Sequence, residues 1–357
     1  MNTQTEVILN RICRQTVEKK ASEIYFLPGQ TPFIRINGEL KALTGEGVIA
    51  VSFINELLDI FLSSEEKEKM EKQREIIVVR SIGKIGNCQI DFYFQRRSAT
   101  CRIKLLTQEI TDLSELDLPE MVKDFTNLLK GIVFVTGPRD SGRSTLLISL
   151  LDHINKNQNK FITTIEEPIK SIMNGFKSLV EQREVGKDTK SFLSGLKYVR
   201  QRNVDVVMVS QVNSAEVMDE IFALAEAGSL VFAMMDTGSA VKTIKRVLHF
   251  YPGEKREDIR YFLSESLGGI IVSRLVPKIG GGRIRAMEIV SATPAVKTII
   301  ATGRLHQLNG VIQTTEDQNS ISLEQYLADL VISGKILSED AVKYCVNEDI
   351  FRSFLRR

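Results

Sequence analysis

The first hundred residues contain short runs of apolar and β-branched residues that are separated by turn residues. The runs read SEIYFL, PFIRI, ELKAL, EIIVVRSI, CQIDFYFQ and TCRIKLL. They predict β-strands, and the Asn37–Gly38 pair between the second and third runs predicts a tight hairpin. Apolar residues at helical spacing predict one helix over 5–20 and one over 51–73. Residues 1–106 are therefore predicted to form a small α+β domain with an antiparallel sheet.

Beyond residue 120, the pattern changes to apolar runs that alternate with amphipathic stretches. The apolar runs read GIVFVTG, KFITTIEEP, VDVVMVS and SLVFAMMDT. Strands that are apolar throughout and separated by helices predict a parallel sheet covered on both faces. We expect this α/β domain over 121–290 and consecutive short helices over 291–357. The polar, acidic and aperiodic stretch 107–120 is predicted to be the linker.

The stretch GPRDSGRS, residues 137–144, lies between an apolar run and a helical pattern. It resembles the phosphate loop G-x-x-x-x-G-K-S/T, whose backbone N–H groups surround phosphates at a helix N-terminus. Ser144 stands where this loop has a Mg²⁺ ligand, and an ordinary strand–helix turn is the alternative interpretation. The candidate nucleotide-binding residues are Gly137, Asp140, Ser141, Gly142, Arg143, Ser144 and Thr145.

Composition narrows the functional classes. The 357 residues contain 47 Lys and Arg against 45 Asp and Glu, a net charge of +2 that does not favour nucleic acid. No apolar run approaches the roughly 18 residues of a membrane span, and the N-terminus lacks a secretory segment, so a cytoplasmic location is expected. The four cysteines are scattered without a CxxC pair, so no zinc site is expected.

Several long stretches resemble the PilT-type retraction motors of type IV pili, within the secretion-ATPase family. They are KASEIYFLPGQTPFIRINGEL, QREVGKDTKSF, GEKREDIRYFLSESLGGIIVSRLVPKIGGGRIRAMEI and TPAVKTII. The lack of a tetracysteine zinc motif argues against the extension and secretion classes. The resemblance implies an N-terminal PAS-like domain, a RecA-like ATPase domain and a hexamer that holds ATP with Mg²⁺ between subunits. It also implies a peripheral position at the inner face of the cytoplasmic membrane, beside a pilus platform protein.

The resemblance assigns roles to individual residues. It maps the family's catalytic glutamate onto Glu166 and a second acidic position onto Gln211. It maps two histidines onto Ser229 and Asp236. An amide can orient water but cannot accept a proton as a carboxylate does. Neither serine nor aspartate can act as a phosphate-sensing imidazole.

The phosphate loop also departs from the family, which has glycine at Asp140 and lysine at Arg143. A broad, planar guanidinium does not simply replace a compact ammonium. Asp140 adds a negative charge close to the expected phosphates, and an ion pair between Asp140 and Arg143 would withdraw the arginine from the ligand. Whether ATP binds therefore depends on the geometry of these two residues.

The family's arginines that reach across the subunit boundary match Arg97, Arg183 and Arg200. The alternative is that each of the three is a solvated surface arginine. No sequence pattern separates these two interpretations.

Four positions with distinct catalytic roles thus differ together, whereas the stretches that shape the fold remain recognisable. This combination indicates a degenerate retraction-motor homologue with little or no hydrolysis, in a homo-hexamer or in a mixed ring with a competent motor. The alternative is a slow but active motor that uses Glu166 as its sole general base. A nucleic-acid translocase is a third idea, and the near-neutral charge argues against it.

Overall fold

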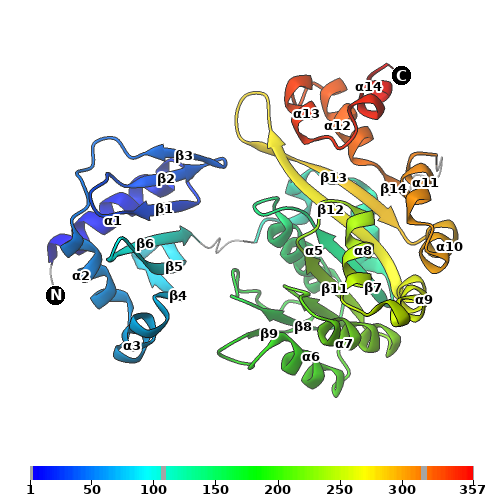
Figure 1. The fold of residues 1–357 in the computed structure, drawn as a ribbon, viewed down its shortest axis with the longest axis horizontal. Coiled ribbons are helices and arrows are strands. Elements are labelled where there is room, and N and C mark those ends of the chain that lie inside the picture. The colour runs from blue at the N-terminus through cyan, green and yellow to red at the C-terminus, as the bar shows by residue number, and fades with distance from the viewer. Residues whose placement is uncertain (1–2, 106–109, 315–319, 357) are drawn as a thin grey trace. The chain divides into compact units, whose positions relative to one another are not determined.

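The computed structural model describes residues 3–105, 110–314 and 320–356, which fold as two compact units that divide between residues 109 and 110 (Figure 1). Each unit has its own hydrophobic core. The division lies within the stretch 107–120 that was predicted as a linker.

The first unit is built on a six-stranded sheet with the order β3-β2-β1-β6-β5-β4, in which all neighbours are antiparallel. The strands are β1 (Glu23–Phe26), β2 (Phe33–Ile36), β3 (Glu39–Ala42), β4 (Glu75–Ile82), β5 (Gly86–Gln95) and β6 (Ser98–Leu105). The helices are α1 (Thr3–Glu18), α2 (Val51–Phe61), α3 (Ser64–Gln73) and the 3₁₀ turn η1 (Gly83–Ile85). The α+β architecture is as predicted, whereas the PAS-like character of this unit stays a prediction.

The β2–β3 hairpin turns at the predicted Asn37–Gly38 pair. Both residues have positive φ, 50° and 91°, as a two-residue type I′ turn requires. The turn fixes the register by placing Ile36 opposite Glu39. The sequence therefore determines this connection locally.

The helix predicted over 51–73 is in fact two helices, α2 and α3. Ser63 accepts a hydrogen bond from the Glu66 backbone at 3.3 Å, and the Glu66 side chain accepts one from the Ser63 backbone at 2.9 Å. This capping box begins a new helix at Ser64. The charged run that follows is therefore the whole of α3 and not the end of a long helix.

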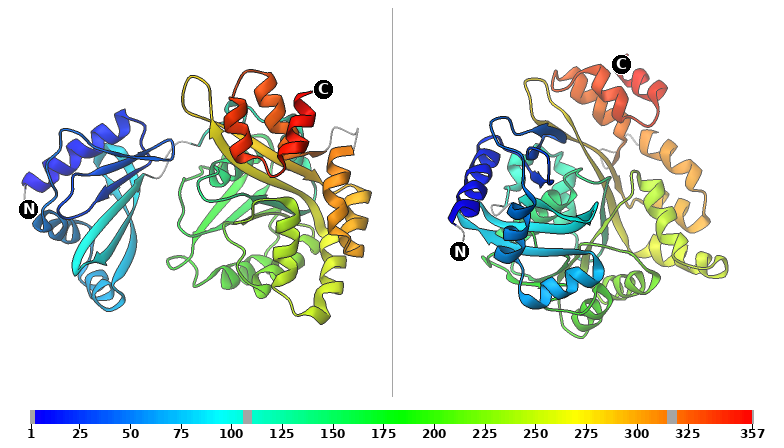
Figure 2. Two further views of the ribbon diagram at one scale, coloured as in Figure 1. Left: turned by 45° about the horizontal axis from the view of Figure 1, so that its top comes forward. Right: turned by 60° about the vertical axis from the view of Figure 1, so that its left-hand side comes forward.

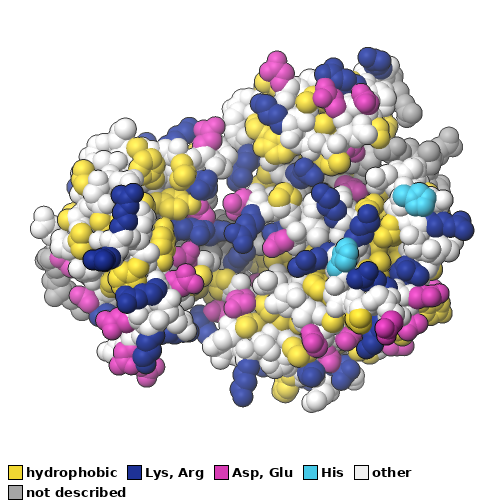
Figure 3. Space-filling model, viewed as in Figure 1, with side chains coloured by type: hydrophobic (Ala, Val, Ile, Leu, Met, Phe, Trp, Pro, Cys, Tyr) yellow, Lys and Arg dark blue, Asp and Glu magenta, His cyan; other side chains and the backbone are white. Residues whose placement is uncertain are grey.

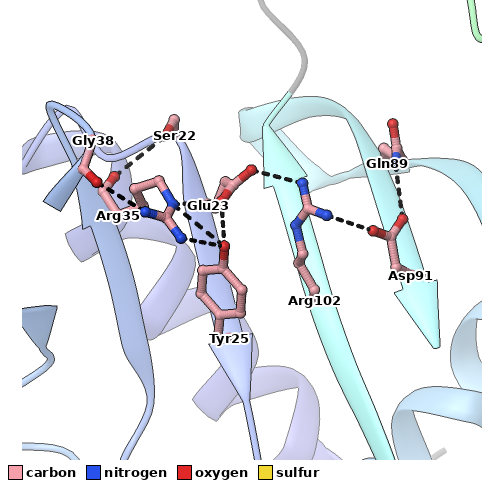
Figure 4. A network of polar contacts seen from close by, with 8 residues as sticks. All are labelled: Ser22, Glu23, Tyr25, Arg35, Gly38, Gln89, Asp91 and Arg102. Atoms are coloured by element: carbon pink, nitrogen blue, oxygen red, sulfur yellow. Dashed lines mark hydrogen bonds and ion pairs between the residues drawn. The ribbon is translucent and has the colours of Figure 1, made fainter. Parts of the chain in front are cut away.

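A network of ion pairs ties β1, β2, β5 and β6 together on one face of this sheet (Figure 4). The nearly buried carboxylate of Glu23 accepts from Arg35 at 2.9 Å and from Arg102 at 2.7 Å, and Tyr25 donates to it. Arg102 also pairs with Asp91 at 3.1 Å. Burial would raise the pKa of Glu23, but the hydrogen bond from Tyr25, the charge of Arg102 and the hydrogen bonds from Arg35 and Arg102 outweigh it, so the pKa is lowered.

The second unit is built on an eight-stranded sheet with the order β14-β13-β12-β7-β11-β10-β8-β9. Neighbours are parallel from β12 to β9, and β13 and β14 add antiparallel strands at the other edge. The strands are β7 (Gly131–Thr136), β8 (Phe161–Glu166), β9 (Leu179–Glu184), β10 (Val206–Val209), β11 (Leu230–Met235), β12 (Leu267–Pro277), β13 (Arg283–Ser291) and β14 (Ser320–Ile321).

Helices cover both faces of this sheet, as predicted (Figure 2). One face carries helices such as α6 (Phe192–Arg200), α7 (Ala215–Glu226), α8 (Ala240–His249), α9 (Arg256–Ser266) and α10 (Pro294–Thr302). The other face carries α5 (Arg143–Asn157), α12 (Leu323–Ile332), α13 (Ser338–Tyr344) and α14 (Glu348–Leu355). The remaining helical elements are α4 (Glu120–Asp124), α11 (Leu308–Thr314), η2 (Leu113–Leu116), η3 (Phe125–Asn127), η4 (Gly253–Lys255) and η5 (Leu305–Gln307).

Two expectations for this unit are corrected, and one strand was not predicted. Residues 110–120 are not a linker, because Leu113 is buried in the core of the second unit and η2 packs on α5. The region 291–357 is not all helical, because β14 pairs with β13. The edge strand β9 escaped prediction because its sequence LVEQRE is mostly polar and lacks an apolar run. Residues 106–109 of the predicted linker lie outside the described residues.

Within the described parts of the chain, no helix is long and apolar enough to cross a membrane. Basic and acidic side chains are interspersed over the face of the second unit that Figure 3 shows. This face therefore presents charges of both signs, in keeping with the near balance of charge in the sequence.

The Glu23 network predicts an acid-dependent loss of stability. Because the folded pKa of Glu23 lies below its usual 4.5, the ionised carboxylate stabilises the first unit above about pH 4.5, and this contribution disappears as the pH falls through the folded pKa. In denaturant titrations between pH 7 and pH 3, we expect Glu23→Gln to lower the unfolding free energy at neutral pH and to flatten its decline in acid. Glu39→Gln, at an exposed ion pair, is the control. Parallel pH profiles for the wild type and Glu23→Gln would contradict the prediction.

Candidate functional site

The candidate site lies at the edge of the second sheet where the parallel strands β7, β8, β10 and β11 end. The segment 137–142 connects β7 to α5, Glu166 ends β8, and Asp236 follows β11. Open parallel sheets bind ligands outside the carboxyl ends of their strands. The topology therefore brings three predicted segments to one edge of the sheet. They are the phosphate loop, the acidic segment that contains Glu166, and the end of β11 at Asp236.

The loop favours glycine at two positions, because both have positive φ and close neighbours. Gly137 has a φ of 148°, and a Cβ atom there would lie 2.3 Å from the backbone oxygen of Ser273. Gly142 has a φ of 80°, and a Cβ atom there would lie 2.9 Å from the guanidinium of Arg285. Asp140 has a φ of 59°, the left-handed conformation that aspartate tolerates better than most residues. The aspartate is therefore compatible with a loop of this shape.

Two side chains from β12 and β13 anchor the loop from below. Ser273 donates to the carbonyl of Ser141 at 2.7 Å, and Arg285 donates to the carbonyls of Ser141 and Gly142 at 3.3 and 3.2 Å. Arg285 is buried, and burial lowers its pKa to about 10, so it remains cationic at neutral pH. A fixed positive charge thus lies directly beneath the loop.

The N-terminus of α5 differs from those of the neighbouring helices. Side-chain oxygens of Ser191, Ser214 and Ser239 cap α6, α7 and α8, whereas the N-cap of α5 is Gly142 and no side chain caps it. The first-turn N–H groups of a helix need partners and carry partial positive charge. The hydroxyl of Ser141 is also buried without a hydrogen-bond partner among the described residues. These groups together form an anion-binding cradle.

Arg143, at the position of the usual loop lysine, lies against the end of β11. Its guanidinium forms an ion pair with Asp236 and donates to the Met235 carbonyl at 2.6 Å. Two of the positions that depart from the family therefore contact each other. The pairing partner is Asp236, which sequence reasoning had treated only as a lost histidine.

Ser144 faces a cation in this structure. Its Oγ accepts a hydrogen bond from Lys170 Nζ at 2.9 Å. Lys170 stands in the loop that follows β8. At the position where the family resemblance expects a second carboxylate, this chain has Gln211. Mg²⁺ in phosphate-loop NTPases needs the loop hydroxyl and a carboxylate. Ligation of Mg²⁺ by Ser144 stays a prediction from the sequence.

Glu166 is buried at the end of β8. Its Oε1 accepts from Thr164 at 2.8 Å and from Gln182 of β9 at 3.1 Å. Burial raises the pKa of Glu166, although these hydrogen bonds and the positive charge of Lys170 oppose the shift. A carboxylate with a raised pKa is suited to proton transfer near neutral pH. The candidate base is therefore present and oriented by two side chains.

Gln211 lines an open cleft next to the loop. The cleft has a volume of about 570 Å³. Its lining residues are Arg139, Ser210, Gln211, Val212, Asn213, Met234, Met235, Asp236, Thr237 and Arg246. The cleft contains amides and arginines, and Asp236 is the one carboxylate in its described lining.

Ser229 does not belong to this site. It precedes β11 and donates to the Val204 carbonyl at 2.7 Å, whereas Asp236 follows the same strand. The whole of β11 therefore separates the two positions that were predicted as one degenerate histidine pair. An extended strand of six residues spans roughly 20 Å, too far for both ends to contact one phosphate.

Among the loop residues, Thr145 has an exposed side chain and lies in the first turn of α5.

Of the predicted boundary arginines, Arg183 stacks on Tyr198 with 4.7 Å to the ring centre, and Arg200 pairs with Glu220 at 3.2 Å. Arg97 lies exposed in the β5–β6 turn. Arg183 and Arg200 thus have partners within their own chain, and contact with a neighbouring subunit stays a prediction for all three.

Three residues that contact the site were missed from sequence: Lys170, Gln182 and Arg285. The two basic residues carried a weak signal. Lys170 ends the acidic segment TTIEEPIK, and Arg285 interrupts the apolar strand RIRAMEIV. Gln182 opens the family-like stretch QREVGKDTKSF, but its contact with Glu166 was not predicted because the polar strand β9 was not recognised.

We expect Arg285→Met to destabilise the second unit, since the loop carbonyls of Ser141 and Gly142 each lose a charged donor and keep only Ser273 Oγ and the Leu146 N–H, respectively. A hydrogen bond from a charged donor contributes about 1.5–3 kcal/mol. Equilibrium unfolding in urea measures the effect. Arg283→Met, at an exposed position of the same strand, is the matched control. Equal unfolding midpoints for the two variants would show that Arg285 does not support the loop.

Comparisons with known proteins agree with this geometry. A sequence model of the Type II/IV secretion system protein family matches residues 2–325. The type IV pilus retraction ATPase PilT of Pseudomonas aeruginosa is 31% identical over 326 residues, which cover 91% of this chain and 94% of PilT. The type IV pilus ATPase PilU of the same organism is 28% identical and covers 97% of this chain and 91% of PilU.

Solved structures show the same fold. The crystal structure of the pilus retraction motor PilT with bound ADP superimposes with a TM-score of 0.85 at 31% identity, and the match covers 97% of this chain and 98% of that chain. The ATPase DotB of Legionella pneumophila has a TM-score of 0.82 at 19% identity, which shows a shared fold alone. The chain therefore belongs to the PilT/PilU-like type II/IV secretion ATPase family.

Proposed function

We propose that this chain binds an adenine nucleotide at its phosphate loop and acts in type IV pilus retraction as a subunit that hydrolyses ATP weakly or not at all. The observation that carries the proposal is the Arg143–Asp236 ion pair, which engages the loop cation with an acid beside an otherwise intact anion cradle. The retraction ATPase and ADP-bound motor among its relatives support the nucleotide class.

Binding is supported by the groups that converge on the loop. The uncapped amides of α5, the buried hydroxyl of Ser141 and the cation of Arg285 all favour an anion there. Asp236 opposes it, because its carboxylate holds the guanidinium of Arg143 and so reduces the positive charge that this arginine offers to a phosphate. The balance favours binding that is weaker than in a loop with free lysine.

Weak hydrolysis is supported by two residues, Gln211 at the family's second acidic position and Arg143 at the position of the loop lysine. Gln211 cannot accept a proton, and general-base catalysis contributes about 10²–10⁴-fold in rate. Arg143 cannot grip phosphates while it pairs with Asp236. Losses of groups that act as a unit do not add simply, yet Glu166 is left without the second carboxylate that the family resemblance expects.

The second candidate function is a slow but active retraction motor. Glu166 favours it, since its raised pKa and its hydrogen bonds with Thr164 and Gln182 are those of an oriented base. In this alternative, Glu166 is the sole general base.

The proposal includes the oligomeric state of the protein and its location in the cell. We infer a homo-hexamer, or a mixed ring with a competent motor, that contacts a pilus platform protein from the cytoplasmic side of the inner membrane. Arg97, Arg183 and Arg200 are the proposed boundary residues. The family relationship supports this assembly.

Phosphate release from Mg-ATP by the purified protein separates the two functions. A site that does not hydrolyse ATP gives a low release rate that is equal in the wild type and in Glu166→Gln. A slow motor gives turnover that Glu166→Gln reduces by about 10²-fold or more. Turnover of that kind would reject the non-hydrolysing proposal and support the motor.

Asp236→Asn tests the ion pair. The substitution keeps the shape, removes the charge that holds Arg143 and removes repulsion of phosphate, so we expect ADP affinity to rise about tenfold. Isothermal titration calorimetry measures it, and Asp258→Asn, at an exposed site on α9, controls for net charge. An unchanged or lower affinity in Asp236→Asn alone would exclude competition between Asp236 and the nucleotide.

A further inference from the structure

The segment between β11 and α8 carries Asp236 and decides where this carboxylate lies. The side chain of Asp236 is 66% exposed, so burial does not hold it in place. Its partner Arg143 also donates to the carbonyl of Met235, which lies directly before Asp236. The direction of the Arg143 guanidinium therefore depends on how firmly the backbone of residues 235–240 is held.

Two side chains from the β12–β13 hairpin hold this segment. Nη2 of Arg274, on β12, donates to the Gly238 carbonyl at 3.0 Å. Glu288, on β13, accepts a hydrogen bond from the Ala240 N–H at 3.1 Å. Burial raises the pKa of Glu288 to about 7, although the Ala240 N–H and the charge of Arg274 oppose the shift. The segment is thus bound at a carbonyl by a cation and at an amide by a carboxyl group.

The same guanidinium binds the C-terminal part of the chain. Nη1 of Arg274 donates to the carbonyl of Tyr344, the last residue of α13, at 3.0 Å. The residues that follow are held by Glu324 of α12, whose Oε1 accepts from the Val346 and Asn347 N–H groups at 3.0 and 3.1 Å. Arg274 therefore joins the segment after β11 to the end of α13.

The shape of arginine suits this link. A guanidinium is planar and carries its N–H donors in a fixed fork, whereas the ammonium of lysine is a point charge on a flexible stem. Nη1 and Nη2 of Arg274 bind different segments, while its Nε is buried without a hydrogen-bond partner among the described residues. Lysine keeps the charge at this position but does not keep a fork that reaches two carbonyls at once.

We propose that Arg274 is a positioning residue that joins Gly238 to the end of α13, holds Asp236 in its ion pair with Arg143 and so limits nucleotide affinity. The inference rests on the proposed nucleotide binding and adds a regulatory contact to it. None of the described residues that line the cleft belongs to α12, α13 or α14. Through Arg274, a movement at the end of α13 nevertheless changes the hold on the segment that carries Asp236.

The first measurement is hydrogen–deuterium exchange without nucleotide. For Arg274→Gln we expect about tenfold faster exchange in peptides that span residues 236–242 and 344–348, because both segments lose the same charged donor. Arg283→Gln, at an exposed position of β13, removes the same charge and is the matched control. It should exchange as the wild type does in both peptides.

The second measurement is ADP affinity by isothermal titration calorimetry in the wild type, Arg274→Gln, Asp236→Asn and the double variant. We expect Arg274→Gln alone to raise the affinity about threefold to tenfold, since Asp236 then holds Arg143 less firmly. In the Asp236→Asn background the same substitution should change the affinity by less than about twofold, because the ion pair is already absent. Asp140 and Lys170 are present in all of these proteins, so their effects on a phosphate cancel in the comparison.

Arg274→Lys separates the fork from the charge. It keeps a cation beside Glu288 but loses the two simultaneous bonds, so we expect changes in exchange and affinity in the same direction as in Arg274→Gln and of smaller size. Thermal unfolding without nucleotide checks that the variants fold. A merely structural arginine would lower ADP affinity, and would do so in both backgrounds.

Three results bear on the inference in different ways. Unchanged exchange of both segments in Arg274→Gln would overturn it, whether or not ADP binds. Equal affinity changes in the wild-type and Asp236→Asn backgrounds would also overturn it, because Arg274 would then act independently of Asp236. Absence of ADP binding in every variant would reject the proposed nucleotide function, and exchange would then decide by itself whether Arg274 joins the two segments.

Discussion

The anchoring of the phosphate loop on the β12–β13 hairpin is the contact on which the rest of the site depends. Ser273 and Arg285 donate hydrogen bonds to the carbonyls of Ser141 and Gly142, and Gly137 and Gly142 pack closely against Ser273 and Arg285. With the carbonyls held below, the amides of the loop and of α5 are directed to the other side. The shape of the loop is therefore fixed by two side chains that bind its carbonyls and does not require the lysine that usually completes it.

The charges around that loop form a consistent set. Arg143 is turned toward β11 by Asp236, and Lys170 reaches Ser144 from the segment after β8. The cationic side chains therefore lie on two sides of the loop, Arg143 toward β11 and Lys170 toward the segment after β8. A nucleotide can be attracted by such an arrangement, whereas transfer of its terminal phosphate requires charge that is placed for the transition state. This difference between ground-state attraction and transition-state stabilisation explains how binding can persist while hydrolysis weakens.

The departures from the family are not independent in space. Arginine in place of lysine and aspartate in place of histidine are brought into one ion pair by the parallel β7–β11 ladder. Lone replacement of the histidine by an acid would repel phosphate, and lone replacement of the lysine would place a broad cation in a narrow loop. Together the two residues satisfy each other. Glu166 is buried and hydrogen-bonded to Thr164. The strand end that carries it is therefore ordered although Gln211 replaces the family's second carboxylate.

The sequence by itself determined the features that depend on local pattern. These include the Asn37–Gly38 hairpin, the apolar strands of the parallel sheet, the phosphate loop after β7 and the position of Glu166 at a strand end. Local rules failed where polar residues form structure, as in the capping box at Ser63 and in the edge strand β9. Only the tertiary structure decided which charges meet: it separated Ser229 from Asp236, joined Asp236 to Arg143, and brought Lys170 and Arg285 to the loop. The reason is physical, because ion pairs and hydrogen bonds form between residues that the sheet order makes neighbours, and that order is set by packing across the whole core and not by spacing along the chain.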